Sequence, residues 1–254
     1  MPDAVVVTAS AGSFQGLVEA LRALPAVVEE RPLMTFAPPL DWGPLDQALG
    51  KLARFDALAV TSPRAAAAFS ARLTAGGSKR PPETLPPAWA AGAGTAAALD
   101  GIVEPVRTPP ERAAGELGAA AALAGAMLAA GVRGPVLFPC GEIRREELPA
   151  RLRAGGVEVE EVVCYRSVLA GEAAARNAAE RARVLVVASP SVAELLARTC
   201  PAGRRPPLLA AGPTTAAAAE ASGWPPSAVA ARPTVDAIVA GVRTLLATPD
   251  GGPA

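Results

Sequence analysis

Short runs of β-branched and other apolar residues alternate along the chain with longer segments rich in alanine and leucine. Strands followed by crossover helices in a parallel sheet give this alternation, because such strands are buried on both faces. The pattern therefore predicts the α/β class. The runs expected to form strands are Ala4–Val7, Val27–Glu30, Ala57–Thr61, Trp89–Ala91, Ile102–Pro105, Val136–Pro139, Val157–Val163, Val184–Ala188, Leu208–Ala211 and Val229–Ala231.

Helices are expected between these strands. Gly16–Leu24 and Glu146–Arg153 have apolar residues at helical spacing, and Gly155 with Gly156 supplies a stop after the second. The uncharged stretch from Leu117 to Val132 is interrupted by glycines and is too short for a membrane span, so it predicts an alanine-rich helix.

The chain also repeats itself loosely. Thr61-Ser62-Pro63-Arg64-Ala65 is echoed by Ala188-Ser189-Pro190-Ser191-Val192, and each follows an apolar strand. Ala90-Ala91-Gly92-Ala93-Gly94-Thr95-Ala96 is echoed by Ala210-Ala211-Gly212-Pro213-Thr214-Thr215-Ala216, each shortly after a double proline. A looser third pair is the opening strand, helix and strand against Val136 to Val163. These echoes predict two related lobes.

Composition narrows the choice of partners. The 254 residues are enough for one large or two small domains, and 24 Lys+Arg balance 24 Asp+Glu. A balanced charge argues against nucleic acid, because nucleic-acid binders usually carry a basic face. The start of the chain has no basic segment followed by a long apolar core, so no export signal is expected and we place the protein in the cytoplasm, away from the membrane.

The complete absence of histidine excludes the largest set of mechanisms. It removes Ser-His-Asp and Cys-His catalysis and any histidine-ligated metal site, and we expect no metal. The three cysteines, Cys140, Cys164 and Cys200, form neither a CxxC pair nor an even set, so they are expected to be reduced thiols rather than a disulfide framework.

Four strand-to-helix turns carry hydroxyl side chains: Ser62-Pro63, Gly94-Thr95, Ser189-Pro190 and Thr214-Thr215. Two interpretations stay open. Serine and threonine are good helix caps, which would make these residues structural. Alternatively, helix N-termini at the carboxyl edge of a parallel sheet bind carboxylate or phosphate oxygens, which would make the turns ligand-binding. The Gly92 to Ala97 turn also nearly matches a dinucleotide-binding fingerprint.

A fifth turn, from Phe138 to Pro149, contains Gly141, Arg144 and Arg145. Cys140 in this turn is expected to be buried and inert, because no histidine is present to act as its base. Tyr165 is the only tyrosine and ends a predicted strand. Its hydroxyl is the most credible donor of a directed hydrogen bond to a leaving oxygen among the remaining residue types.

With these segments in order, the chain resembles the uroporphyrinogen-III synthase family over nearly its whole length. Five segments carry the resemblance: Phe55 to Ala65, the Gly92 to Ala98 turn, Leu137 to Pro149 with Tyr165-Arg166 downstream, Val186 to Ser191, and Ala211 to Ala217.

The resemblance implies two flavodoxin-like lobes with parallel sheets, joined by a short two-stranded ladder. Residues 1–33 with 168–254 would form a discontinuous lobe and 36–165 a continuous one, with the active cleft between them. Arg31–Phe36 and Val162–Val168 would form the ladder.

The implied reaction is the closure of hydroxymethylbilane into uroporphyrinogen III in tetrapyrrole biosynthesis, with loss of water, inversion of ring D and no cofactor. Hydroxymethylbilane synthase would supply the substrate, and the family default is a monomer. Tyr165 would assist departure of the hydroxyl group. The implied substrate-binding residues are Ser62, Pro63, Arg64, Gly94, Thr95, Gly141, Arg144, Ser189, Ser191, Thr214 and Thr215.

Two other functions are compatible with these features. A two-lobed binding protein for an anionic small molecule would use the same hydroxyl-bearing turns without chemistry. A nucleotide-binding oxidoreductase would use the glycine-rich turn at Gly92.

Overall fold

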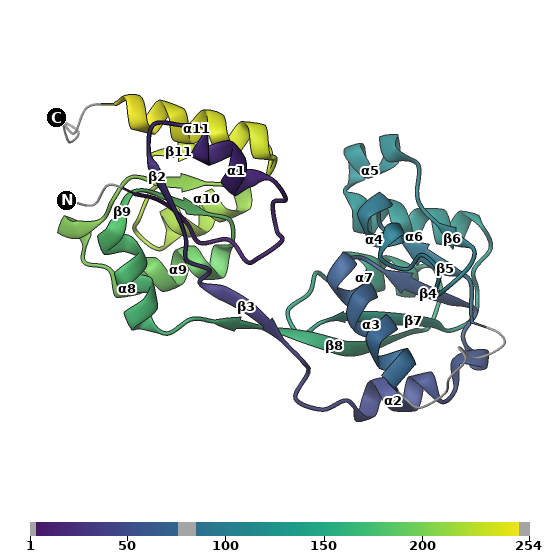
Figure 1. Ribbon diagram of the computed structural model, residues 1–254. Helices are drawn as coiled ribbons and strands as arrows, with labels where there is room; N and C mark the ends of the chain where they lie inside the picture. The colour runs from purple at the N-terminus through teal and green to yellow at the C-terminus, as the bar shows by residue number, and fades with distance from the viewer. Residues whose placement is uncertain (1–3, 76–84, 249–254) are drawn as a thin grey trace. The chain divides into compact units, whose positions relative to one another are not determined.

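The computed structural model describes residues 4–75 and 85–248, and the chain divides into two compact units (Figure 1). The discontinuous unit combines Met1–Thr35 with Val168–Ala254, and the continuous unit is Phe36–Ser167. Among the described residues, no helix combines the length and apolar character needed to cross a membrane.

The discontinuous unit contains a five-stranded sheet in the order β11-β10-β9-β1-β2. All its strand pairs are parallel, and the order is that of a flavodoxin-like sheet. Its elements are β1 (Ala4–Val7), α1 (Leu17–Arg22), β2 (Val27–Glu30), α8 (Glu172–Arg181), β9 (Ala182–Val187), α9 (Pro190–Thr199), a 3-10 turn (Ala202–Arg204), β10 (Leu208–Ala210), α10 (Pro213–Ala221), β11 (Ala228–Val229) and α11 (Val235–Ala247).

The continuous unit contains most of a six-stranded sheet in the order β3-β8-β7-β4-β5-β6. Its elements are β3 (Met34–Ala37), α2 (Gly43–Leu49), a 3-10 turn (Leu52–Arg54), β4 (Ala57–Val60), α3 (Pro63–Ala75), β5 (Ala88–Ala90), α4 (Ala93–Ala97), β6 (Val106–Arg107), α5 (Glu111–Leu117), α6 (Ala119–Ala129), β7 (Val136–Gly141), α7 (Glu147–Ala154) and β8 (Val159–Leu169). Strands β3 and β8 each extend by two residues into the segments of the discontinuous unit. The expected two-stranded ladder is present as β3 and β8, which form one edge of this sheet rather than a separate element.

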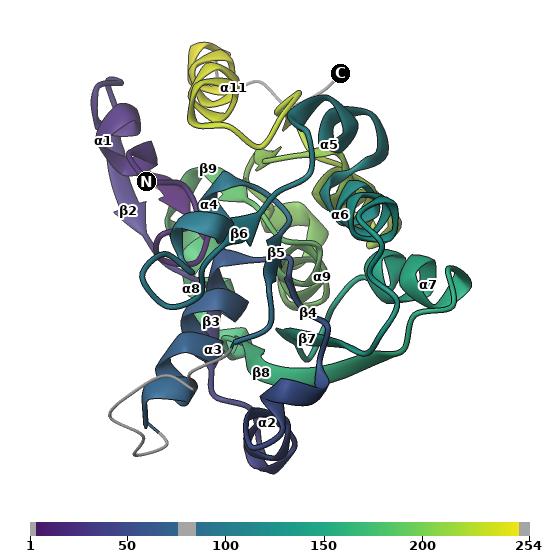
Figure 2. The ribbon, with the colours of Figure 1, turned by 90° about the vertical axis from the view of Figure 1, so that its right-hand side faces the viewer.

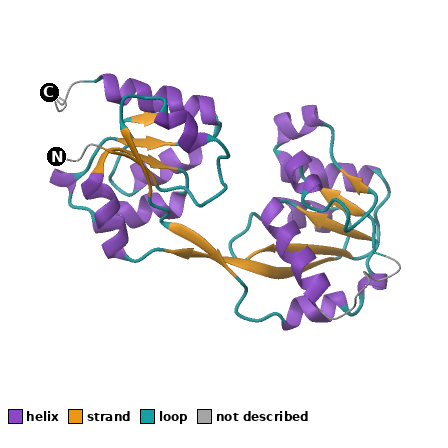
Figure 3. Cartoon of the chain, viewed as in Figure 1, coloured by secondary structure: helices purple, strands orange, loops and turns teal. Residues whose placement is uncertain are grey.

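Helices flank the strands of each sheet (Figure 3). Apolar clusters lie on both faces of each sheet, as the apolar strand sequences predict. In β1, Val5 and Val7 pack against α1 and α11, whereas Ala4 and Val6 face α8, α9 and α10. This alternation follows from the two-residue period of a strand.

The two units share one topology in circularly permuted order. In the continuous unit, α2, α3 and α4 contribute to the core on one face of the sheet and α6 and α7 to the core on the other (Figure 2). In the discontinuous unit, α8, α9 and α10 take the place of the first group, and α11 and α1 that of the second. Strands β4 and β5 correspond to β9 and β10, so the repeats seen in the sequence occupy equivalent turns.

One predicted strand is wrong. Ile102–Pro105 forms a turn, and the strand in this region is β6, which begins at Val106. The backbone N–H groups of Ile102 and Val103 both donate to the carbonyl of Leu99, so they are not available to a sheet. Val103 is nevertheless buried, which explains why the apolar pattern suggested a strand.

Candidate functional site

The carboxyl edge of the continuous unit's sheet contains a crevice at its topological switch point. Strands β4 and β7 are neighbours, but the chain leaves β4 for α3 on one face and leaves β7 for α7 on the other. Ligands of open α/β sheets bind at such points. A cavity of about 360 Å³ lies here, and its lining includes Ser62, Gly141, Arg144, Arg145 and Tyr165. The structure therefore brings four of the predicted site residues, Ser62, Gly141, Arg144 and Tyr165, into one cavity.

Tyr165 lies against Gly141 across neighbouring strands. The two residues are partners in the register of β7 and β8, immediately after an irregularity between Cys140 and Gly141. A Cβ atom added to Gly141 would lie 2.7 Å from Cζ and 2.9 Å from the hydroxyl oxygen of Tyr165. This position thus requires glycine because the phenol ring approaches the backbone closely.

Arg64, a predicted site residue outside the cavity lining, is linked to Tyr165 through Phe36. Its guanidinium carbon lies 3.4 Å from the centroid of the Phe36 ring, and Phe36 packs edge-to-face on Tyr165 with centroids 5.8 Å apart. Burial lowers the pKa of Arg64, and its interaction with Tyr165 acts in the opposite direction. Among the side chains that the structure describes, no carboxylate forms an ion pair with Arg64.

Arg144, in contrast, is already paired. Its guanidinium donates to Glu161 of β8, and Arg153 donates to the other oxygen of the same carboxylate at 2.6 Å. Burial alone would raise the pKa of Glu161, but the two arginine hydrogen bonds outweigh it and lower the pKa. The hydrogen bond to Glu161 raises the pKa of Arg144. Glu161 therefore fixes the Arg144 head group and offsets its charge. The neighbouring Arg145 is exposed, as Arg144 is, but forms no ion pair among the side chains that the structure describes.

The four hydroxyl-bearing turns differ in the structure. Ser62 accepts a hydrogen bond from the backbone N–H of Ala65 at 3.1 Å and so caps α3. Ser189 is the N-cap residue of α9 but forms no side-chain capping bond. Thr95 and Thr215 are buried, and each is the third residue of its helix, which starts after Gly92 or Gly212.

The turn after β5 lies beside the turn after β4. An added Cβ on Gly94 would lie 3.8 Å from Cγ of Pro63, so these two predicted residues are neighbours, although neither lines the crevice cavity. The helix that follows, α4, is only five residues long. A short helix of this kind offers little of the N-terminal dipole on which a dinucleotide site depends.

The carboxyl edge of the discontinuous unit carries the remaining predicted residues. Ser189 and Ser191 follow β9, and Thr214 and Thr215 follow β10, the strand next to it in the sheet. Ser189 is partly exposed and Thr214 is exposed, so their hydroxyls are accessible to a ligand at this edge.

The cysteines carry no chemistry here. All three are buried and unpaired, and burial raises the pKa of Cys140 and of Cys164 to about 12. The thiolate is the reactive form, so the expectation that Cys140 is inert agrees with its environment. No cluster of histidine, cysteine or acidic residues suited to a metal occurs in the described part of the chain.

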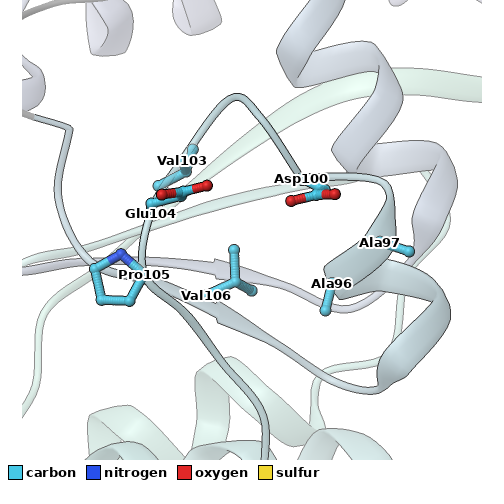
Figure 4. A pocket seen from close by; sticks show the side chains of 7 residues that line it. All are labelled: Ala96, Ala97, Asp100, Val103, Glu104, Pro105 and Val106. Atoms are coloured by element: carbon cyan, nitrogen blue, oxygen red, sulfur yellow. The ribbon is translucent and has the colours of Figure 1, made fainter.

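A larger hollow of about 690 Å³ lies elsewhere in the continuous unit, between the end of α4 and β6 (Figure 4). Asp100 and Glu104 both line it, with apolar residues between them. Two carboxylates repel an anionic ligand, so this hollow does not suit the class of ligand expected at the crevice.

Sequence reasoning missed Phe36 and Glu161 as parts of the site. Phe36 was expected only in the ladder, and its contact with Tyr165 depends on pairing between distant segments. For Glu161 a signal existed, since Glu160-Glu161 interrupts the apolar strand from Val157 to Val163. A carboxylate in a buried strand requires a partner, and the nearby arginines were candidates.

The chain is similar to known proteins over most of its length. The family model described as uroporphyrinogen-III synthase HemD matches residues 15–240. The uroporphyrinogen-III synthase of Synechococcus elongatus is 38% identical over 71 residues, which is 28% of this chain and 27% of that protein. The matched segment thus spans about a quarter of that relative.

Two solved structures share the fold. A mutant uroporphyrinogen III synthase from the extremely thermophilic bacterium Thermus thermophilus superposes with a TM-score of 0.61 at 17% identity, covering 96% of this chain and 98% of that one. The uroporphyrinogen-III synthetase of Helicobacter pylori gives 0.60 at 18% identity, covering 96% and 100%.

Proposed function

Because the chain belongs to the uroporphyrinogen-III synthase HemD family, we propose that it closes linear hydroxymethylbilane into uroporphyrinogen III. In this reaction the hydroxyl group leaves ring A as water, and the substituted carbon of ring D attacks the azafulvene that results. The spiro intermediate then fragments and recloses with ring D inverted. The enzyme would accordingly be a cyclising lyase.

The observation that carries this proposal is the crevice itself. It combines one phenol, two arginines and a capped helix start in a single cavity, in a chain that has no histidine. A substrate with several carboxylates needs donors that fold it into a ring-closing geometry rather than a strong base. Backbone N–H groups, hydroxyls and arginines provide such donors, and positioning supplies much of the rate and selectivity.

In this mechanism Tyr165 donates a hydrogen bond to the departing hydroxyl group. Breaking the carbon–oxygen bond places negative charge on that oxygen, and a directed donor stabilises it. The pyrrole of ring A loses its N–H proton as the azafulvene forms, so hydroxide and proton together balance as water. The close approach of Tyr165 to Gly141 keeps the ring at the cavity wall. Arg144 and Arg145 are proposed to bind substrate carboxylates, with Arg145 contributing the less compensated charge because Glu161 pairs with Arg144.

The remaining contacts are proposed by position at the carboxyl edge of each sheet. These residues are Ser62, Pro63, Arg64, Gly94 and Thr95 in the continuous unit, and Ser189, Ser191, Thr214 and Thr215 in the discontinuous unit.

The deciding experiment supplies freshly generated hydroxymethylbilane to the purified protein and separates the oxidised porphyrins by isomer. Predominantly type III product supports the proposal, because uncatalysed closure gives type I. Type I product alone, formed at the uncatalysed rate, rejects it and favours the alternative of a binding protein for an anionic small molecule. That alternative then requires saturable binding of a polycarboxylate without turnover.

A further inference from the structure

Tyr165 has no hydrogen bond to its hydroxyl among the described residues, yet its ring is closely constrained. Gly141 lies on one side, where even a methyl group would collide with the ring. Phe36 of β3 lies on another, with its ring edge-to-face at an interplanar angle of 73°. Tyr165 lines both the crevice and a second cavity of about 380 Å³, and Phe36 lines only the second.

Phe36 has a second partner on its face. The guanidinium of Arg64 stacks over the ring at 3.4 Å from the centroid. A partly buried arginine without a carboxylate loses hydration, and the negative face of an aromatic ring offsets part of that loss. Arg64 belongs to the first turn of α3, directly after Ser62 and Pro63. Phe36 thus contacts Tyr165 of β8 and Arg64 in the first turn of α3, and both elements border the crevice.

From these contacts we infer that Phe36 is a positioning residue. It holds the Tyr165 phenol, which lines the crevice, and the Arg64 guanidinium, which lies outside the cavity lining, in fixed places on either side of its ring. This inference rests on the proposed function, in which Tyr165 assists departure of the hydroxyl group. Phe36 does not itself line the crevice and acts only through its two neighbours.

Phe36 can hold both neighbours only because its side chain is aromatic. Both contacts depend on the quadrupole of the Phe36 ring. The negative face of the ring attracts the Arg64 guanidinium, and the ring packs edge-to-face on Tyr165. An aliphatic side chain of similar size would fill the space but would offer neither interaction. Simple core packing, in contrast, would accept leucine or methionine with little functional effect.

The test compares Phe36→Leu and Phe36→Met with Phe36→Tyr, which keeps the ring. Phe55→Leu is the matched control, because Arg54 stacks on Phe55 at 4.8 Å in a part of the same unit that the mechanism does not use. Each variant is assayed for kcat and KM with hydroxymethylbilane. The Tyr165 ring signals of each variant are also recorded by NMR after labelling with ¹³C-tyrosine. Their assignment is unambiguous in the wild type and the aliphatic variants, because the chain has one tyrosine.

We expect Phe36→Leu and Phe36→Met to lower kcat about tenfold or more, with a smaller change in KM, and to shift the Tyr165 ring signals. Phe36→Tyr should keep kcat within about twofold of the wild-type value. Phe55→Leu should lower stability without changing kcat or the Tyr165 signals. Methionine serves as the second aliphatic variant if the leucine variant does not fold.

The inference is overturned if both aliphatic variants keep wild-type kcat, or if their loss of kcat is no larger than that of Phe55→Leu. It is also overturned if the Tyr165 signals do not move. These outcomes differ from failure of the proposed function, in which the wild-type protein itself makes no type III product. In that case the NMR comparison still decides whether Phe36 orders the tyrosine.

Discussion

Gly141 leaves room for the ring of Tyr165, since an added Cβ would lie 2.7 Å from its Cζ atom. The two residues face each other because β7 and β8 pair in register, with an irregularity just before Gly141. The glycine therefore determines where the phenol lies relative to the crevice.

Replacing Gly141 with alanine should displace Tyr165 and lower kcat about tenfold or more, because small displacements of a reacting group are costly. Steady-state kinetics with hydroxymethylbilane measures this change. Gly155→Ala is the matched control, since its added Cβ would meet Leu128 Cδ2 at 2.6 Å, in a part of the unit that the mechanism does not use. The control should lower stability and leave kcat unchanged; equal kcat in both variants would remove the functional role of Gly141.

Tyr165→Phe isolates the hydroxyl group, because it keeps the ring between Gly141 and Phe36. We expect kcat to fall on the order of tenfold to hundredfold, which is at or below the lower end of the contribution of full general acid catalysis, because Tyr165 only donates a hydrogen bond. The free energy of unfolding should be nearly unchanged. Rate and isomer ratio are measured together. Full turnover with full type III selectivity would show that the hydroxyl does not assist loss of water.

The strands and lobes could be predicted from the sequence because burial on both faces of a parallel sheet leaves a continuous apolar run. The same signal failed at Ile102–Pro105, where Val103 is buried from a turn. Burial of an apolar side chain does not show whether its backbone hydrogen-bonds in a strand or in a turn.

The arrangement of the site was less predictable, because it depends on register between distant segments. The contact between Phe36 and Tyr165 exists only when β3 lies beside β8, and a shift by one residue would turn Tyr165 to the other face. Similarly, the sequence singles out Arg144, but only the pairing of β7 with β8 shows that Glu161 compensates its charge.

Glu161 gives the protein an acid-sensitive interaction. Its pKa in the folded state lies below the ordinary value of 4.5, so its ion pairs stabilise the fold above that pH and are lost as the pH falls through the lowered pKa. Glu161→Gln should therefore flatten the fall in stability below pH 4.5. Urea unfolding measured between neutral and acidic pH tests this.

The matched control for this change is Glu158→Gln, which alters an exposed glutamate of the same segment that has no arginine partner in the described part of the chain. If the two variants show the same pH dependence, the Arg144–Glu161–Arg153 contacts do not contribute to acid sensitivity.

The buried thiols should be unreactive in the folded protein. With the pKa of Cys140 and Cys164 raised to about 12, very little thiolate exists near neutral pH, and neither side chain is accessible. A thiol reagent should label the native protein slowly and all three cysteines after denaturation. Rapid labelling of one native thiol, identified by mass spectrometry, would contradict this assignment.

Ser62 and Ser189 occupy equivalent turns, but only Ser62 makes a capping hydrogen bond. Comparing their alanine variants therefore distinguishes a helix-capping role from a ligand-binding role. Ser62 accepts a hydrogen bond from Ala65 N–H, so Ser62→Ala should cost about 1 kcal/mol of stability. Ser189 makes no capping bond, so Ser189→Ala should change stability by less than about 0.5 kcal/mol.

If Ser189 instead contacts the ligand, its alanine variant should raise the dissociation constant for uroporphyrinogen III about threefold to tenfold, the loss of one ordinary hydrogen bond. Thermal unfolding and product binding measured on both variants give the comparison. A Ser189→Ala variant that loses stability but binds product normally would return this serine to a capping role, and the ligand-binding assignment of the turn after β9 would then fall to Ser191 alone.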